Sequence, residues 1–118
     1  MWEYHQGTGT LLHDGKFEGS GYSGTGTGRN NPAAQAEQAV GPIPQGHYKI
    51  GGAYQHPHLG PCVMNLDPAP DTDTLGRGDF RIHGNNQAND ASHGCIILGP
   101  VQRRFIAESD DRVLNVVA

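Results

Sequence analysis

The chain has 118 residues, including 18 glycines and 8 prolines, and a formal net charge of −4. This length provides for one domain with a single core, which we assign to residues 1–118. The apolar residues fall in short runs bounded by glycine and proline, a pattern typical of short strands joined by turns and not of a disordered chain.

The distribution of charged and apolar residues excludes two classes of partner. The basic residues are scattered, so they form no stripe that would follow a nucleic-acid backbone. No stretch approaches the roughly 20 apolar residues that span a bilayer, and we expect no membrane insertion. Residues 1–6 lack the charged and apolar regions of a signal peptide, so we expect no export by the general route.

The N-terminal part of the chain predicts a hairpin followed by a glycine-rich segment. Residues 2–4 and 10–13 have strand character, and Asp14-Gly15 is a two-residue turn signal, because both central positions of that turn need positive φ. Residues 19–28 alternate glycine with small polar residues. This segment is either a flexible surface loop or a loop whose backbone approaches a ligand closely.

The central part predicts a short helix and two further strands. Asn31 is an N-cap candidate with Pro32 in the first helical position, an alanine-rich interior and Gly41 beyond the end, which predicts about two helical turns. Residues 41–46 form a proline-rich turn. Residues 47–50 and 62–66 are predicted strands, and residues 67–78 an exposed loop.

The C-terminal part predicts strands at residues 80–83, 95–98 and 113–117 and a helix at residues 100–108 that begins on proline. The whole chain is therefore expected to be mostly β, a sandwich or barrel of about seven strands with one or two short helices. No internal repeat or linker interrupts it.

Residues 79–98 carry the strongest chemical signal. Two strand-like runs, one ending on His83 and the other beginning on Cys95, enclose a loop of Gly, Asn, Asp and Ser residues. A cysteine is a good nucleophile as its thiolate, which a neighbouring imidazole can generate. We prefer His83 as this base over His93, because neighbouring positions in a tight turn usually point their side chains apart.

The residues around Cys95 suggest how the reaction would be supported. With no side chain at Gly94, the N–H groups of Gly94 and Cys95 can converge as an oxyanion hole. Ser92 is predicted to hold the turn through hydrogen bonds to the backbone. Arg81 alternates in phase with His83 and can bind a substrate carboxylate.

One alternative and two further predictions concern the cysteines and histidines. His83, His93 and Cys95 are chemically suitable zinc ligands, but no fourth ligand stands at a recurrent spacing, so we assign no metal and no other cofactor. Cys62 fits a small buried hydrophobic residue. We predict that Cys62 and Cys95 lie too far apart to form a disulfide.

In His83-Gly84 and in Ser92-His93-Gly94-Cys95-Ile96, the chain resembles the active-site signature of the L,D-transpeptidase (YkuD-like) catalytic domain. The resemblance is closer to the type VI secretion L,D-transpeptidase effectors, formerly a domain of unknown function. The shared motifs, in order, are Gly-Tyr-Ser-Gly (21–24), Asn-Asn-Pro (30–32), Gly-Pro-Ile-Pro-x-Gly-x-Tyr (41–48), Phe-Arg-Ile-His-Gly (80–84) and Ser-x-Gly-Cys-Ile (92–96). Together they cover nearly the whole chain.

The resemblance implies a role for each residue of the site. Cys95 would be the acylated nucleophile and His83 the general base, its other ring nitrogen held by a backbone carbonyl near Gly84. Gly94 and Cys95 would supply the oxyanion-hole N–H groups, with Ser92 and His93 shaping the pocket. The substrate would contact four residues: Tyr22, Ser23, Arg81 and Gly84.

The resemblance also implies a substrate and a biological setting. The family cleaves the bond between the third residue of a peptidoglycan tetrapeptide stem, commonly meso-diaminopimelate, and the D-Ala at position four. It passes the acyl group to water or to a free D-amino acid. Such an antibacterial toxin would reach the periplasm of a target bacterium through a secretion apparatus, without a signal peptide, and would have a cognate immunity protein.

Two departures from the family pattern bear on the reaction. Ile96, Ile97 and Leu98 follow the cysteine where the family usually has arginine or asparagine, and the interval from His83 to Cys95 is short. Both features favour the effector branch over enzymes that make 3-3 crosslinks. Two alternatives remain open here: a non-catalytic peptidoglycan-binding module and a zinc-dependent peptidase.

Overall fold

A computed structural model describes residues 1–118, which form one sheet of ten strands with a single α-helix. The elements are β1 (Trp2–His5), β2 (Thr10–His13), β3 (Lys16–Ser20), β4 (Tyr22–Ser23), η1 (Gly26–Gly28), η2 (Pro32–Ala34), β5 (Gly46–Ile50), β6 (Tyr54–His56), β7 (Gly60–Pro68), β8 (Arg81–His83), β9 (Ile96–Ile97), α1 (Pro100–Glu108) and β10 (Val113–Val117). The mostly β prediction is confirmed. The expected strand count was too low, because strands such as β4 and β6 are two or three residues long and carry no apolar run.

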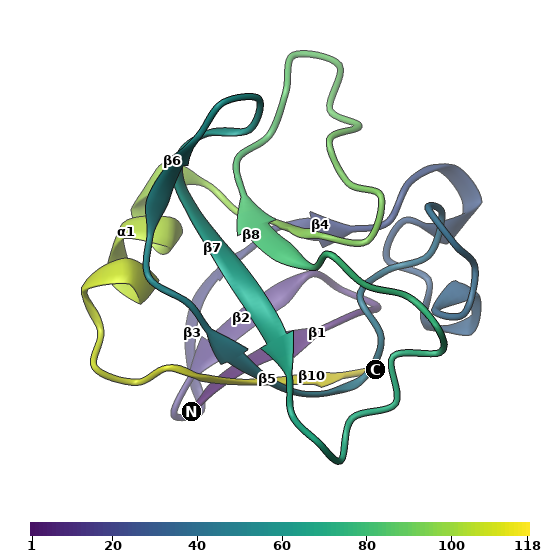
Figure 1. The fold of residues 1–118 in the computed structure, drawn as a ribbon, viewed down its shortest axis with the longest axis horizontal. Helices are drawn as coiled ribbons and strands as arrows, with labels where there is room; N and C mark the ends of the chain where they lie inside the picture. The colour runs from purple at the N-terminus through teal and green to yellow at the C-terminus, as the bar shows by residue number, and fades with distance from the viewer.

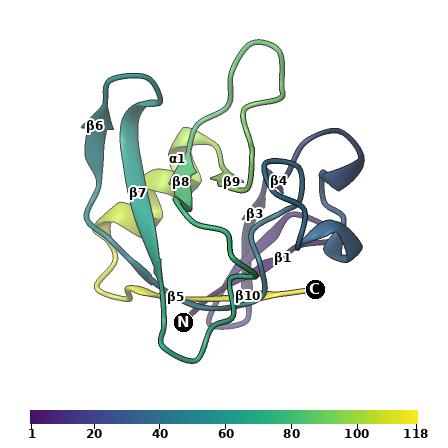
Figure 2. The ribbon, with the colours of Figure 1, turned by 45° about the vertical axis from the view of Figure 1, so that its right-hand side comes forward.

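The sheet curls into an almost closed barrel (Figures 1 and 2). Its strand order is β3-β2-β1-β10-β5-β7-β8-β9-β4, with β6 paired to β7 outside this path. The edge strands β3 and β4 are consecutive in the chain, with only Gly21 between them, and the Gly21 N–H donates to the Gly9 carbonyl over 2.8 Å. The curling leaves β7, β8, β9 and β4 side by side.

The core fills the interior of this barrel with fifteen buried residues. Trp2 and Tyr4 enter it from β1, Ile82 from β8 and Ile96 from β9. Helix α1 adds Ile106 to the same cluster, so it packs its apolar side on the sheet. Burying such side chains contributes about 1.5–3 kcal/mol each.

Two local predictions are confirmed. The hairpin turn between β2 and β3 has positive φ at both Asp14 and Gly15, and His13 pairs with Lys16 across it. Helix α1 spans Pro100–Glu108 with proline in its first turn, as the sequence indicates.

The predicted two-turn helix at residues 31–41 is wrong, although its first turn is present. The Asn31 side chain accepts from the Ala33 N–H, and Pro32 follows in η2, which ends at Ala34. The Gln35 carbonyl, which would accept the Ala39 N–H in an α-helix, accepts from the Arg77 guanidinium over 2.6 Å, and Ala39 has φ +58°. A long-range contact therefore replaces helix propagation with tight turns.

The glycine-rich segment 19–28 is ordered rather than a flexible loop. It contains the end of β3, all of β4 and the 3₁₀ turn η1. The loop between β8 and β9, residues 84–95, projects away from the barrel (Figures 1 and 2). No helix of the chain has the length and apolar character needed to cross a membrane.

Candidate active site

Strands β8 and β9 present the predicted base and nucleophile on the same face of the sheet. The two strands are parallel, with Ile82 beside Ile96, and both isoleucines lie in the core. Because side chains alternate along a strand, Arg81 and His83 point to the opposite, outward face. Extending the register by one residue sets Cys95 beside Arg81, on that same outward face.

Register also relates these residues to the next strand. Asn65 of β7 pairs with Arg81, so Asn65, Arg81 and Cys95 form a row across the outward face. His83 lies two residues further along β8. With strands about 4.8 Å apart and a rise of about 3.3 Å per residue, the Cα atoms of His83 and Cys95 are roughly 8 Å apart, a separation that their side chains can bridge.

His83 is held with one ring nitrogen free to accept a proton. Its Nδ1 lies 2.9 Å from the Gly84 carbonyl, which can only accept, so Nδ1 carries the hydrogen and Nε2 is the acceptor. This is the carbonyl contact that the family resemblance implied. Burial lowers the pKa of His83 from its ordinary value of 6.5, and the Gly84 hydrogen bond opposes this shift. The imidazole is therefore neutral at pH 7.

The Cys95 thiol is also neutral in this arrangement. Burial raises its pKa, while the Arg81 N–H and the positive charge of Arg81 oppose the rise. The sulfur lies 3.7 Å from the Asp79 carbonyl, to which the thiol donates. Because the thiol points to Asp79, it must turn to give its proton to His83; such catalytic contacts often tighten only when substrate is bound.

The predicted pair of oxyanion donors is only half available. The Cys95 N–H has no acceptor within the chain, whereas the Gly94 N–H donates to the Ser92 hydroxyl over 3.2 Å. The prediction for Gly94 is therefore corrected: its amide is occupied by the side chain two residues before it. Its positive φ of +129° instead allows the backbone to turn, and a Cβ there would lie 2.5 Å from the Arg77 guanidinium.

Ser92 holds the turn through hydrogen bonds to the backbone, as predicted. It is fully buried, and its hydroxyl donates to the Cys95 carbonyl over 2.6 Å and accepts from the Gly24 N–H over 2.8 Å. Together with the Gly94 contact, this hydroxyl joins the β4 end to the nucleophile turn. Such a saturated hydroxyl positions Cys95 and is not itself a nucleophile.

Arg77 is a positioning residue that the sequence reasoning missed. Its buried guanidinium donates to the carbonyls of Gln35, Gly41 and Pro42 and, over 3.4 Å, to that of His93. It thus fastens the 35–42 segment to the turn that carries Cys95. An arginine between two glycines in a predicted loop gives no sequence signal for this role.

Tyr22 and Ser23, implied as substrate contacts, are both buried. The Ser23 hydroxyl donates to the Gly94 carbonyl and accepts from the Ile43 N–H, so it is enclosed and the substrate-contact prediction is wrong for this arrangement. The Tyr22 hydroxyl accepts from the Ala91 N–H and donates to Asn85 over 2.6 Å, which anchors the projecting loop.

His93 is exposed, and its ring Nδ1 lies 3.3 Å from the Ala39 carbonyl. The ligand atoms of His83, His93 and Cys95 do not converge into a cluster that could hold a metal. The residues whose ligand atoms do converge are His13, Asp14 and Asp111, which are remote in the sequence from the site. The geometry gives the zinc-peptidase alternative no support.

The two cysteines are free, in agreement with the prediction that they do not pair. Cys62 lies in β7, where the register places it opposite Gly84. It is three residues from Asn65, which pairs with Arg81, and β7 is two strands away from the strand of Cys95. Strand spacing and rise then separate the two Cα atoms by about 14 Å. A disulfide needs about 4.4–6.8 Å.

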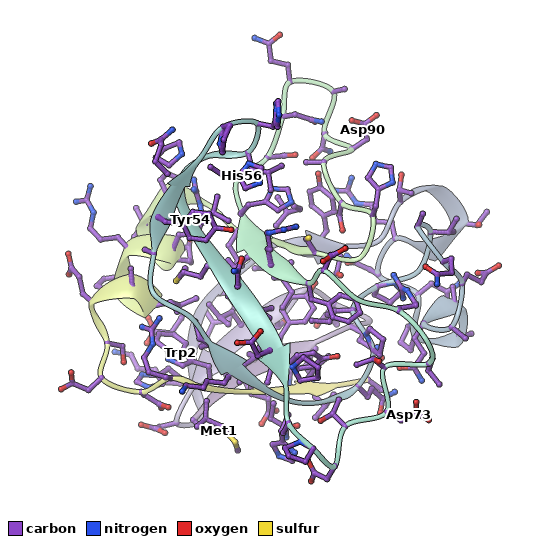
Figure 3. The ribbon with its side chains drawn as sticks, viewed as in Figure 1. Met1, Trp2, Tyr54, His56, Asp73 and Asp90 are labelled. Atoms are coloured by element: carbon purple, nitrogen blue, oxygen red, sulfur yellow. The ribbon has the colours of Figure 1, made fainter.

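Strand β6 borders the outward face. Tyr54 donates its hydroxyl to the Asn65 side chain over 2.7 Å, and the charge of His56 contributes to lowering the pKa of His83. Figure 3 shows both side chains close to β7. Neither residue carried a sequence signal, because β6 is short and contains no apolar alternation.

Two cavities are lined by sequence neighbours of His83, although neither is lined by His83 or Cys95 themselves. One, of about 570 Å³, is lined by Gly84, Tyr22 and Arg29 among others, and the Arg29 guanidinium stacks 3.6 Å from the centre of the Tyr22 ring. The other, of about 170 Å³, is lined by Arg81 and Asp79.

Comparison with known proteins identifies the family. No curated protein matches the chain. Residues 17–117, however, match the family model described as the Tlde1 domain. This match covers every element from the second strand of the hairpin to β10 and includes His83 and Cys95. The chain therefore belongs to the Tlde1 domain family, the family of type VI secretion L,D-transpeptidase effectors.

Proposed function

We propose that the chain is a cysteine L,D-carboxypeptidase and L,D-transpeptidase acting on peptidoglycan tetrapeptide stems. It cleaves the bond between the third residue, meso-diaminopimelate, and the D-Ala at position four. One observation carries the proposal: His83 and Cys95 share the outward face of β8 and β9, and the Gly84 carbonyl fixes the imidazole with Nε2 unprotonated. Membership of an effector family supports the same interpretation.

Acylation would proceed from the neutral pair. The Cys95 thiol turns from the Asp79 carbonyl, passes its proton to His83 Nε2, and its sulfur attacks the carbonyl carbon of the third stem residue. The Cys95 N–H stabilises the oxyanion of the tetrahedral intermediate. As the C–N bond breaks, His83 returns the proton to the departing D-Ala amine, which leaves a thioester on Cys95.

Deacylation repeats these steps with a second nucleophile. Water, or the neutral amine of a D-amino acid, attacks the thioester and gives a proton to His83. The C–S bond then breaks and the proton returns to sulfur, which restores the thiol. Water yields a tripeptide, and a D-amino acid yields an exchanged tetrapeptide.

The setting of the reaction follows from the effector family. We propose that the secretion apparatus delivers the protein to the periplasm of a target bacterium, and that an immunity protein covers the Cys95 cleft in the producer. Affinity capture from producer periplasm should recover a tight partner whose binding protects Cys95 from alkylation. Recovery of no partner would contradict this part of the proposal.

The function is tested with disaccharide tetrapeptide, with and without D-Met, followed by mass spectrometry of the products. The parent chain should release D-Ala or replace it with D-Met, whereas Cys95→Ala should do neither. Cys62→Ala is the matched control, because it removes the other thiol of the chain, which lies two strands from Cys95, and should retain activity. Unchanged tetrapeptide with the parent chain would contradict the proposal and favour a binding module.

A further inference from the structure

The smaller cavity beside Cys95 contains charged groups of both signs. Its volume is about 170 Å³, and its polar lining comes from Asn65, Asp67, Asp79 and Arg81. At about 30 Å³ for each water, this is room for roughly six waters or a group with a similar number of heavy atoms. Cys95 and His83 do not line this cavity, but two of its lining residues adjoin the nucleophile: Arg81 lies beside Cys95 in the register of β8 and β9, and the Asp79 carbonyl accepts from the Cys95 thiol.

Arg81 lacks the partners that the other enclosed arginines have. The Arg81 Nε atom is buried without any hydrogen-bond partner. By contrast, Arg103 donates to the carbonyls of Leu98 and Pro61, and Arg112 donates to four carbonyl oxygens of its own surroundings. No nitrogen of the Arg81 side chain donates to another group of the chain, so its guanidinium can pair with an acceptor that enters the cavity.

The carboxylates of the cavity are also unpaired. Asp67 and Asp79 are exposed, and neither takes part in an ion pair, since all ion pairs of the chain lie among the N-terminal amine, His5, His13 and nearby carboxylates. The cavity therefore offers one guanidinium for an anion and two carboxylates for a cation, and the guanidinium comes from the residue beside Cys95 in the sheet.

We propose that this cavity binds the zwitterionic amino-acid end of a diamino-acid side chain at the third position of the stem peptide, with Arg81 on its carboxylate and Asp67 and Asp79 on its ammonium group. The proposal rests on the function proposed above and specifies its substrate. Planar bidentate pairing makes an arginine well suited to a carboxylate.

Two other parts of the reaction also carry a carboxylate, but they fit the cavity less well. The D-Ala leaving group has no free ammonium group while it is bound, because its nitrogen is in the bond that breaks. A free D-amino acid has both charges, but its amine must be neutral and must reach the thioester, so it cannot remain paired with Asp67 or Asp79. The side chain of the third stem residue keeps both charges throughout.

Binding to the Cys95→Ala protein tests the inference without turnover. Calorimetry would compare tetrapeptides with meso-diaminopimelate, with the same residue amidated on its side-chain carboxylate, and with lysine. We expect the unmodified peptide to bind about 10- to 100-fold more tightly than either analogue, because each lacks the charge-assisted bonds to Arg81. Adding Arg81→Met should abolish this preference.

Asp67→Asn should weaken binding of the diaminopimelate and lysine peptides alike, since both carry the ammonium group. Asp71→Asn is the matched control, because this exposed aspartate does not line the cavity and should leave all affinities unchanged. Equal affinity for the three peptides would overturn the inference. So would an effect of Arg81→Met confined to the KM for free D-Met, which would assign the cavity to the acceptor.

The two proposals can fail separately. A diaminopimelate preference that depends on Arg81, found in a chain that leaves tetrapeptide uncleaved, would uphold the cavity assignment and contradict the catalytic function. Cleavage at equal kcat/KM for diaminopimelate and lysine peptides would uphold the function and overturn the assignment. A chain that neither binds nor cleaves the tetrapeptide would contradict both proposals.

Discussion

Along strands β7, β8 and β9, alternate residues face the core and the candidate site, so the two faces of the same sheet differ in composition. The inward residues are Met64, Ile82 and Ile96, and the outward residues are Asn65, Arg81 and Cys95, with His83 beside them. The inward set is apolar and fully enclosed, while the outward set consists of an amide, a guanidinium and a thiol on residues that are not fully enclosed. The barrel therefore builds its stability and its candidate chemistry from neighbouring positions that can be changed independently.

The largest expected effect is on the outward face. Cys95→Ala should reduce D-Ala release to background, because no other thiol reaches the site, while the melting temperature stays within a few degrees of the parent value. Product analysis and thermal unfolding measure the two quantities. A variant that loses activity only because it has unfolded would show that Cys95 contributes to stability and that the two faces do not act independently.

His83→Gln should lower kcat/KM by about 10²–10⁴-fold, the range typical of a lost general base. Glutamine has an amide that can still donate to the Gly84 carbonyl, so the loss should come from the missing acceptor for the thiol proton. Steady-state kinetics measure it. Activity within tenfold of the parent would show that another group takes the proton.

Ile82→Ala changes the inward face between two outward site residues and should lower the free energy of unfolding by about 2–5 kcal/mol. Denaturant titration measures this change. At temperatures where the variant is folded, its kcat should remain within a few fold of the parent value. A stable variant that has lost its activity would contradict the independence of the inward and outward faces.

Ser92→Ala tests the turn that carries Cys95 and joins it to the end of β4. Removing the hydroxyl leaves the Gly24 N–H without its acceptor and the Cys95 carbonyl without its donor, which should destabilise the chain by about 1–3 kcal/mol. Activity should fall as well, because Cys95 loses a support. A change in neither unfolding nor kinetics would refute the positioning role.

The smallest expected effect is that of pH. Burial lowers the pKa of His83 below 6.5, so the neutral base persists in mild acid and the acid limb of kcat/KM should have its midpoint below pH 6.5. The same shift means that the unfolded chain binds the proton first, so stability falls as pH drops from 6.5 towards the lower folded pKa. An acid limb above pH 7 would contradict a buried, neutral His83.

Local patterns predicted the parts of the site that depend on strand alternation. His83 and Arg81 share a face because they are two residues apart in a strand, and the hairpin at Asp14-Gly15 follows from turn chemistry. The family resemblance added the Gly84 carbonyl contact, which is present. These features depend on neighbours in the sequence, so the sequence contains enough information to predict them.

The missed features depend on side-chain contacts to the backbone, one of them between distant residues and one between near neighbours. The helix at residues 31–41 stops early because Arg77, 42 residues further along, takes the Gln35 carbonyl. The Gly94 N–H is unavailable because the Ser92 side chain folds back onto it. Neither interaction leaves a periodicity or a motif, so propensity and spacing alone could not reveal it.

Trapping the acyl-enzyme would test directly whether Cys95 is the nucleophile. The parent chain would be mixed with disaccharide tetrapeptide, quenched in acid within the first turnover and measured by intact-protein mass spectrometry, with peptide mapping of the adduct. If Cys95 is the nucleophile, the parent chain should carry an adduct equal to the disaccharide tripeptide minus one water, confined to Cys95, retained on Cys62→Ala and absent from Cys95→Ala. Turnover with no adduct on the parent chain, or an adduct that persists on Cys95→Ala, would show that Cys95 is not the nucleophile.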